Sequence, residues 1–179
     1  ATVGQFVASA LGIEEAHVLH LSTGVIGTRL PLDRVEAGLA SLAPGLTADD
    51  AALEAVAIAL RTTDSVTKVA TTTLDMPGAD GRPVSVTMIG IAKGVGMIHP
   101  NMATMLSVVL TDAAVEPAVL WGLLRPAAAR TWDQLSVDGD TSTNDTVFVL
   151  ASGVAAALSV TEGSVAAAAL GAGIEGVAR

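Results

Sequence analysis

The residues best suited to chemistry lie in segment 93–110, Lys-Gly-Val-Gly-Met-Ile-His-Pro-Asn-Met-Ala-Thr-Met-Leu-Ser-Val-Val-Leu. Its two glycines permit backbone conformations closed to other residues, and the His99-Pro100 step forces an extended or turning path. The apolar run from Met105 predicts a strand that anchors the C-terminal end of the loop. Thr104 stands where the loop meets this run, which is a place to expose a nucleophile.

The bond between Ala103 and Thr104 is therefore a candidate for self-cleavage. A neutral threonine hydroxyl is a poor nucleophile, but a freed N-terminal threonine carries its own base, an α-amine with a reference pKa of about 7.7–8.0. The expected route is attack by Thr104 Oγ on the Ala103 carbonyl, an N-to-O acyl shift, and hydrolysis of the ester. From residue type alone, a threonine that begins an ordinary strand is the simpler interpretation.

Three further motifs accompany this segment: Ser-Thr-Gly-Val-Ile-Gly at 22–27, Thr-Thr-Asp at 62–64, and Asp-Gly-Asp-Thr-Ser-Thr-Asn-Asp at 138–145. Each is common alone. Together, and in this order, they resemble the ornithine acetyltransferases of arginine biosynthesis, also called bifunctional glutamate N-acetyltransferases. The resemblance covers most of the chain. It implies an αββα sandwich, a layered α+β fold with two sheets between helical layers.

The resemblance also implies the catalytic residues. Cleavage between Ala103 and Thr104 makes Thr104 the nucleophile of a new subunit, and Thr23 and Gly24 match the pair that forms the oxyanion hole. A donor of that kind contributes about 2.7–4 kcal/mol in the transition state. From sequence alone, Ser-Thr-Gly is equally a plain turn.

Substrate contacts are implied at Lys93, Thr62 and again Thr104. Lys93 is one of only two lysines and would bind a substrate carboxylate, whereas without the family it is equally a solvent-exposed lysine at a strand end. Without the family, Thr62 is simply a polar residue at a helix terminus. For Asp64 two interpretations stay open, a residue of the site or a local turn-former.

The implied reaction is acetyl transfer from N-acetylornithine to glutamate through acetyl-Thr104, by a ping-pong path without metal or organic cofactor. Both substrates carry an α-carboxylate near the transferred group, so one cation could orient both. Acetyl-CoA remains a further possible donor. The resemblance also implies an α2β2 heterotetramer of processed subunits.

Two other hypotheses stay open. An N-terminal-nucleophile amidase or aminopeptidase would share the self-cleavage but pass the acyl group to water. A catalytically silent scaffold fragment is the other, because the family's later glutamate and its C-terminal asparagine and threonine have no matching positions here. We expect residues 1–179 to be a single α/β unit and an incomplete, internal portion of a precursor roughly twice as long.

Composition narrows the class of partner. A net charge of −9 argues against nucleic acid and anionic membrane surfaces, so small molecules are the expected partners. Hydrophobic residues make up 51%, but no apolar run approaches the roughly 20 residues that a spanning helix needs. Cysteine is absent, which excludes thiolate chemistry, and no secretory signal pattern is present, so we expect a cytoplasmic protein.

Hydrophobic periodicity predicts the elements that must position these residues. We expect strands at 18–22, 67–74, 84–91, 104–111 and 147–150, with a hairpin turn at 77–83. We expect helices at 31–39, from a capping box at 47–50 to about residue 61, at 116–134 with a kink or an interruption at Pro126, and in the Ala-rich end of the chain.

The acidic loop 138–145 invites a calcium interpretation, but Thr143 and Val149 occupy the positions where an EF-hand needs Gly and Glu. We therefore predict a hydrogen-bonded loop that supports the site, and no metal. The three histidines are too scattered for a zinc motif. Neither a P-loop nor a dinucleotide fingerprint occurs.

Overall fold

The computed structural model describes residues 2–25, 27–98 and 105–179. The chain divides into two compact units, 1–56 and 57–179. The expectation that 1–179 makes one α/β unit stays a prediction.

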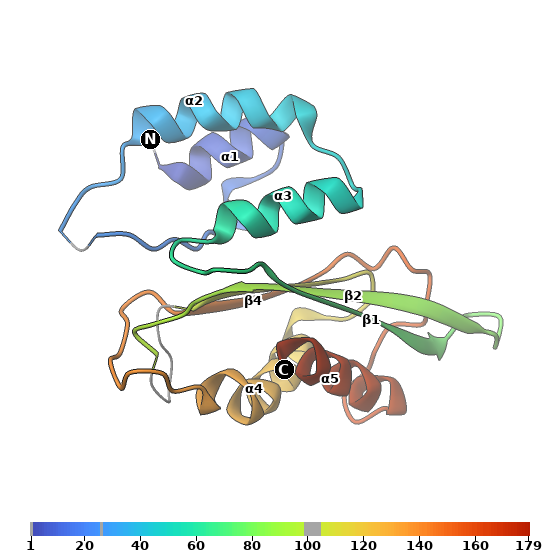
Figure 1. The fold of residues 1–179 in the computed structure, drawn as a ribbon. Helices are drawn as coiled ribbons and strands as arrows, with labels where there is room; N and C mark the ends of the chain where they lie inside the picture. The colour runs from blue at the N-terminus through green and yellow to red at the C-terminus, as the bar shows by residue number, and fades with distance from the viewer. Residues whose placement is uncertain (1, 26, 99–104) are drawn as a thin grey trace. The chain divides into compact units, whose positions relative to one another are not determined.

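The first unit is helical. Helix α1 (Val3–Leu11) begins with a capping box, in which Thr2 and Gln5 satisfy each other's backbone N–H groups, and it ends at Gly12 in the left-handed conformation with φ 67°. Helix α2 (Leu32–Leu42) follows a long connection and passes into a 3₁₀ turn at Ala43–Gly45. Helix α3 (Asp50–Leu60) begins in this unit and ends in the second. Figure 1 labels these helices.

Two expectations for the first unit are wrong. Residues 18–22 are not a strand: Val18 has an extended backbone, but no described strand pairs with it, and Leu19 is 58% exposed, so the alternating pattern has no buried face. The cap of α3 is Asp49, whose Oδ1 accepts a hydrogen bond from the Ala52 N–H at 2.8 Å, and not Thr47 two residues earlier.

The second unit is built on one mixed sheet of four strands in the order β1-β2-β3-β4. β1 (Lys68–Pro77) and β2 (Pro83–Lys93) form the predicted hairpin, and β3 (Leu106–Thr111) runs antiparallel to β2. β4 (Thr146–Ala151) pairs with β3 in parallel, across a connection that contains α4 (Pro117–Arg130). This confirms the strands predicted at 67–74, 84–91, 104–111 and 147–150, to within two or three residues at most ends.

The β1–β2 turn depends on a close approach at Gly78. Its N–H donates to the Arg82 carbonyl at 2.8 Å, and a Cβ at Gly78 would lie 2.7 Å from that same oxygen. Only glycine fits here. The turn sets the register of the whole hairpin, so it also sets where β2 ends at Lys93.

One face of the sheet packs on α4 and on α5 (Val165–Ala178), which lie together on the same side of it in Figure 1. The core between them contains Val86, Met88, Val109, Leu170 and Ile174, each fully buried. In a strand the other face carries the alternate residues, and on β2 these include Ile89, Ile91 and Lys93. The sheet therefore separates an apolar core from the face on which Lys93 lies.

Pro126 lies inside α4 without ending it, so the helix is not interrupted there, and the alternative of a kink stays a prediction. Proline removes one helical N–H and frees the carbonyl four residues earlier, that of Gly122. Both residues are exposed, so water can satisfy that carbonyl.

Helices and a mixed antiparallel and parallel sheet confirm the predicted α+β class. The described residues form one sheet, so the second sheet of the αββα arrangement stays a prediction. None of the helices in the described ranges combines the length and apolar character that crossing a membrane requires.

Candidate functional site

The site is organised by a row of residues at one end of the sheet. Lys93, the last residue of β2, lies opposite Leu106, the first of β3, which in turn lies opposite Thr146, the first of β4. Met105 and Asp145 precede the last two and so lie at the same end of the sheet. Thr104 is the residue directly before Met105.

Lys93 is buried, with 3% of its surface exposed, so the alternative of a solvent-exposed strand-end lysine is wrong. Burial lowers the pKa of its ammonium, while the charges of Asp64 and Asp145 act in the opposite direction. Neither carboxylate is within ion-pair distance: the ion pairs among the described residues do not include Lys93. A buried ammonium without an ion-pair partner among the described residues can bind an anionic group from outside the fold.

Asp64 reaches this end of the sheet from the segment after α3. Its Oδ1 accepts hydrogen bonds from the Gly94 N–H, at 2.9 Å, and from the Lys68 ammonium. Burial opposes the charged form, but these donors outweigh it and hold the pKa of Asp64 below its ordinary value. The partner at Gly94 is 30 residues away, so Asp64 is more than a local turn-former.

Asp145 comes from the loop before β4. Its Oδ1 accepts a hydrogen bond from the Met105 N–H at 2.7 Å, and the Met105 carbonyl accepts one from the Thr146 N–H at 3.1 Å. Met105 is thus fixed on both sides of its backbone. Burial raises the pKa of the Asp145 carboxyl, and the Lys93 charge partly offsets this.

The start of the acidic loop holds the end of the glycine loop. Asp138 accepts from the Met97 N–H at 2.6 Å and from the Ile98 N–H at 2.9 Å, and these bonds lower the pKa of its carboxyl. The Val137 N–H donates to the Ile98 carbonyl at 2.7 Å. Gly94 has φ +143°, a conformation that suits glycine. The loop is hydrogen-bonded, as predicted, and it holds the end of the glycine-rich segment; that it supports the site stays a prediction.

The remaining predicted residues are less closely tied to this row. Thr62 is exposed just past the end of α3, two residues before Asp64, as a helix-terminal residue would be. Thr23 is half-buried and Gly24 exposed, in the connection between α1 and α2 of the first unit. Their approach to the row stays a prediction.

The predicted cleavage site, Ala103 and Thr104, lies outside the described residues, as does His99. Within the described ranges, no group of three or more His, Asp or Glu side chains could hold a metal ion.

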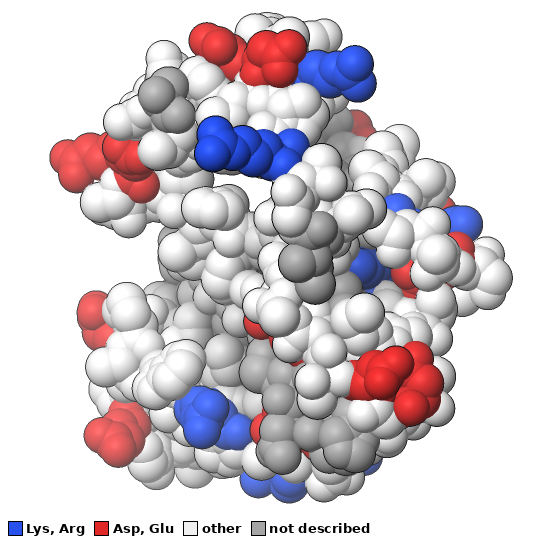
Figure 2. Space-filling model, turned by 90° about the vertical axis from the view of Figure 1, so that its left-hand side faces the viewer, with Lys and Arg blue, Asp and Glu red and all other residues white. Residues whose placement is uncertain are grey.

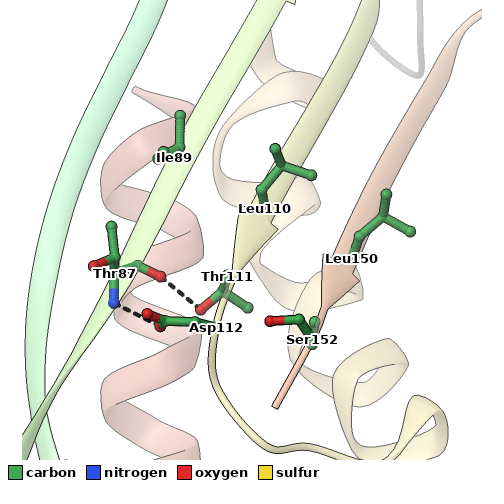
Figure 3. A pocket seen from close by; sticks show the side chains of 8 residues that line it. Thr87, Ile89, Leu110, Thr111, Asp112, Leu150 and Ser152 are labelled. Atoms are coloured by element: carbon green, nitrogen blue, oxygen red, sulfur yellow. Dashed lines mark hydrogen bonds between the residues drawn. The ribbon is translucent and has the colours of Figure 1, made fainter. Parts of the chain in front are cut away.

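A pocket of about 440 Å³ lies at the other end of the strands. Figure 3 shows Ile89, Leu110 and Leu150 on three neighbouring strands along its wall, with Asp112 bonded to the Thr87 N–H at 2.7 Å. The described residues that line it include a carboxylate but no Lys or Arg. It therefore suits an anionic ligand less well than the Lys93 end does.

Figure 2 shows how the charged side chains are distributed over one face. On the face shown in Figure 2, the basic atoms form separate groups among acidic ones and no continuous basic surface. With a net charge of −9, the chain offers that face no advantage in binding a polyanion.

Comparison with known proteins finds related sequences. Two are called arginine biosynthesis bifunctional protein ArgJ: that of Symbiobacterium thermophilum, 49% identical over 87% of this chain and 37% of its own length, and that of Geobacter sulfurreducens, 46% identical over 90% and 39%. A third, from Aspergillus terreus, has the same name followed by the word mitochondrial. It is 43% identical over 89% of this chain and 34% of its own length. The chain spans between a third and two fifths of the length of these relatives.

The family model described as the ArgJ family matches residues 1–179. This agrees with the family resemblance of the four motifs, and the three related sequences carry the same family name. The chain belongs to the ArgJ family.

Proposed function

We propose that this chain is an internal portion of a self-processing precursor that transfers an acetyl group from N-acetylornithine to glutamate. Thr104 is the nucleophile, Thr23 and Gly24 donate to the oxyanion, and Lys93 and Thr62 bind substrate. The observation that carries the proposal is the buried Lys93 ammonium, without an ion-pair partner among the described residues. Lys93 lies opposite Leu106, which follows Thr104 by two positions.

Processing comes first. Thr104 Oγ attacks the Ala103 carbonyl, the peptide C–N bond breaks as an ester forms, and the Thr104 amine is released. Water then cleaves the ester and leaves a carboxylate on Ala103 and a free hydroxyl on Thr104. The hydrogen bonds that fix Met105 on both sides support this proposal, because they hold the residue next to the reacting bond in place.

Transfer follows in two steps. The freed α-amine takes the hydroxyl proton as Oγ attacks the acetyl carbonyl of N-acetylornithine, and the proton passes to the departing ornithine nitrogen. The α-amine of glutamate then attacks the acetyl ester, and Oγ leaves with a proton. Lys93 would bind the α-carboxylate in both steps, so a single cation serves donor and acceptor.

The names of the relatives support this assignment, because they state a role in arginine biosynthesis and call the proteins bifunctional. The processed subunits would assemble as an α2β2 heterotetramer, and acetyl-CoA would be tested as a second donor. A cytoplasmic location belongs to the same proposal, although the Aspergillus terreus relative is called mitochondrial.

Acceptor competition tests the reaction type. The complete precursor is given N-acetylornithine labelled in the acetyl group, with and without glutamate, and the label is followed by NMR. We expect most of it to appear as N-acetylglutamate when glutamate is present. Release of acetate at the same rate with or without glutamate would instead identify an amidase.

A further inference from the structure

Two acidic residues far apart in sequence serve the Lys93 end of the sheet in the same way. Each uses its Oδ1 to accept a backbone N–H beside the cross-strand row: Asp64 from Gly94 at 2.9 Å, and Asp145 from Met105 at 2.7 Å. Gly94 directly follows Lys93. The backbone on both sides of the loop that carries Thr104 is thus tied to a carboxylate.

The second oxygen of each carboxylate is the unusual feature. Asp64 Oδ2 and Asp145 Oδ2 are both buried, and neither has a hydrogen-bond partner among the residues that the structure describes. A buried carboxylate oxygen without a partner is costly, because it loses its hydration and gains no hydrogen bond. Such a cost needs a compensating interaction.

Lys93 supplies the opposite charge. Its ammonium is buried, and the acidic groups that act on it among the described residues are these two, one from the segment after α3 and one from the loop before β4. Lys68, the only other lysine, pairs directly with Asp64 from β1. In the described part of the chain Lys93 pairs directly with neither carboxylate, so the attraction is exerted over a longer range.

We propose that Asp64 and Asp145 are positioning residues that hold the Lys93 ammonium at the end of the sheet, available to an anionic group of the substrate. The proposal rests on the proposed role of Lys93 in binding a carboxylate. Two anchored charges, one from the segment after α3 and one from the loop before β4, attract the ammonium, and neither is within ion-pair distance of it. The same carboxylates tie down the backbone beside the cross-strand row, so cation and nucleophile strand are held by one pair of groups.

An Asn substitution separates these two tasks. Asp145→Asn keeps the oxygen that accepts from the Met105 N–H and removes the charge, and Asp64→Asn does the same at Gly94. Asp112→Asn is the matched control: Asp112 Oδ1 also accepts a backbone N–H, that of Thr87 at 2.7 Å, but its charge is not among those that act on Lys93.

The first experiment is a titration of Lys93 in the 179-residue chain, made with ¹³C-labelled lysine. Two side-chain signals are expected, since the chain has two lysines, and Lys68→Arg assigns them. We expect Asp145→Asn and Asp64→Asn each to lower the pKa of Lys93 by about 1 unit, the smaller end of the effect of a neighbouring opposite charge. The control should leave the titration of Lys93 where it is.

The second experiment follows the pH profile of transfer in the complete precursor. Deprotonation of Lys93 at high pH should remove carboxylate binding, so the alkaline limb of kcat/KM should move to lower pH by the same amount in each Asn variant. Rates that fall without any movement of the limb would show a merely structural role and overturn the proposal.

The two proposals can fail separately. An unchanged Lys93 titration in both Asn variants overturns the positioning role even if Lys93 is essential for activity. A lowered pKa with a fully active Lys93→Met enzyme would leave the positioning in place and refute the carboxylate clamp of the proposed function.

Discussion

Replacement of Lys93 by methionine is the sharpest perturbation of the proposed substrate site. Methionine keeps much of the apolar stem, so the packing at the end of β2 is largely retained, but the ammonium is lost. Because Lys93 is 3% exposed, little water is at hand to take its place. A hydrogen bond to a charged group contributes about 1.5–3 kcal/mol, so kcat/KM should fall by about 10- to 150-fold.

The assay measures kcat/KM for N-acetylornithine and for glutamate in the complete precursor, with thermal unfolding of the same samples. The value of kcat/KM should fall to a similar degree for both substrates, since both present an α-carboxylate. Arg82→Met is the matched control, because Arg82 is an exposed cation in the β1–β2 turn, with 86% of its side chain exposed. A Lys93→Met enzyme within about twofold of the parent would refute the clamp, because that corresponds to less than the weakest charged hydrogen bond.

Three further outcomes are expected from the same geometry. Because burial lowers the pKa of Lys93, kcat/KM should decline on the alkaline side at a pH below the ordinary lysine value of 10.5, and a profile flat beyond that value would contradict the clamp. Asp138→Ala should speed hydrogen exchange at the Met97 and Ile98 amides by about tenfold or more, because each amide loses a hydrogen bond to a charged group, which contributes about 1.5–3 kcal/mol. The Val109 amide in the sheet should stay protected, and equal rates at Met97 and Ile98 in the parent and the variant would show that Asp138 does not hold the loop. Gly78→Ala should destabilise the chain by about 1–3 kcal/mol in urea unfolding, because its Cβ would lie 2.7 Å from the Arg82 carbonyl, whereas Gly122→Ala, with open space around it, should not.

The sequence predicts the second unit well because its signals are local. Alternating β-branched runs and a Pro-Gly turn identify the β1–β2 hairpin, and the family motifs direct attention to Lys93. Burial of Lys93 is not a local property: it depends on what the fold brings over the end of β2. For the same reason the sequence leaves Asp64 undecided, since its partner at Gly94 lies 30 residues away.

The errors have a common physical origin. Residues 18–22 have the composition of a strand, but a strand needs a neighbour, and none of the described strands pairs with them. Pro126 is expected from sequence to kink or interrupt its helix, yet α4 continues through it. The carbonyl that it frees, at Gly122, is exposed and can bind water. Asp49, and not Thr47, caps the N-terminus of α3. Capping motifs in the sequence do not locate a helix end to within these two residues.

The central claim is that Thr104 carries the acetyl group between donor and acceptor. The most direct measurement is peptide mapping by mass spectrometry of the complete, processed precursor after brief incubation with N-acetylornithine alone. We predict one added acetyl group in the peptide that begins at Thr104, and its discharge as N-acetylglutamate when glutamate is added. An acetyl group that glutamate cannot remove, or normal transfer by a pre-cleaved Thr104→Gly variant, would contradict the account.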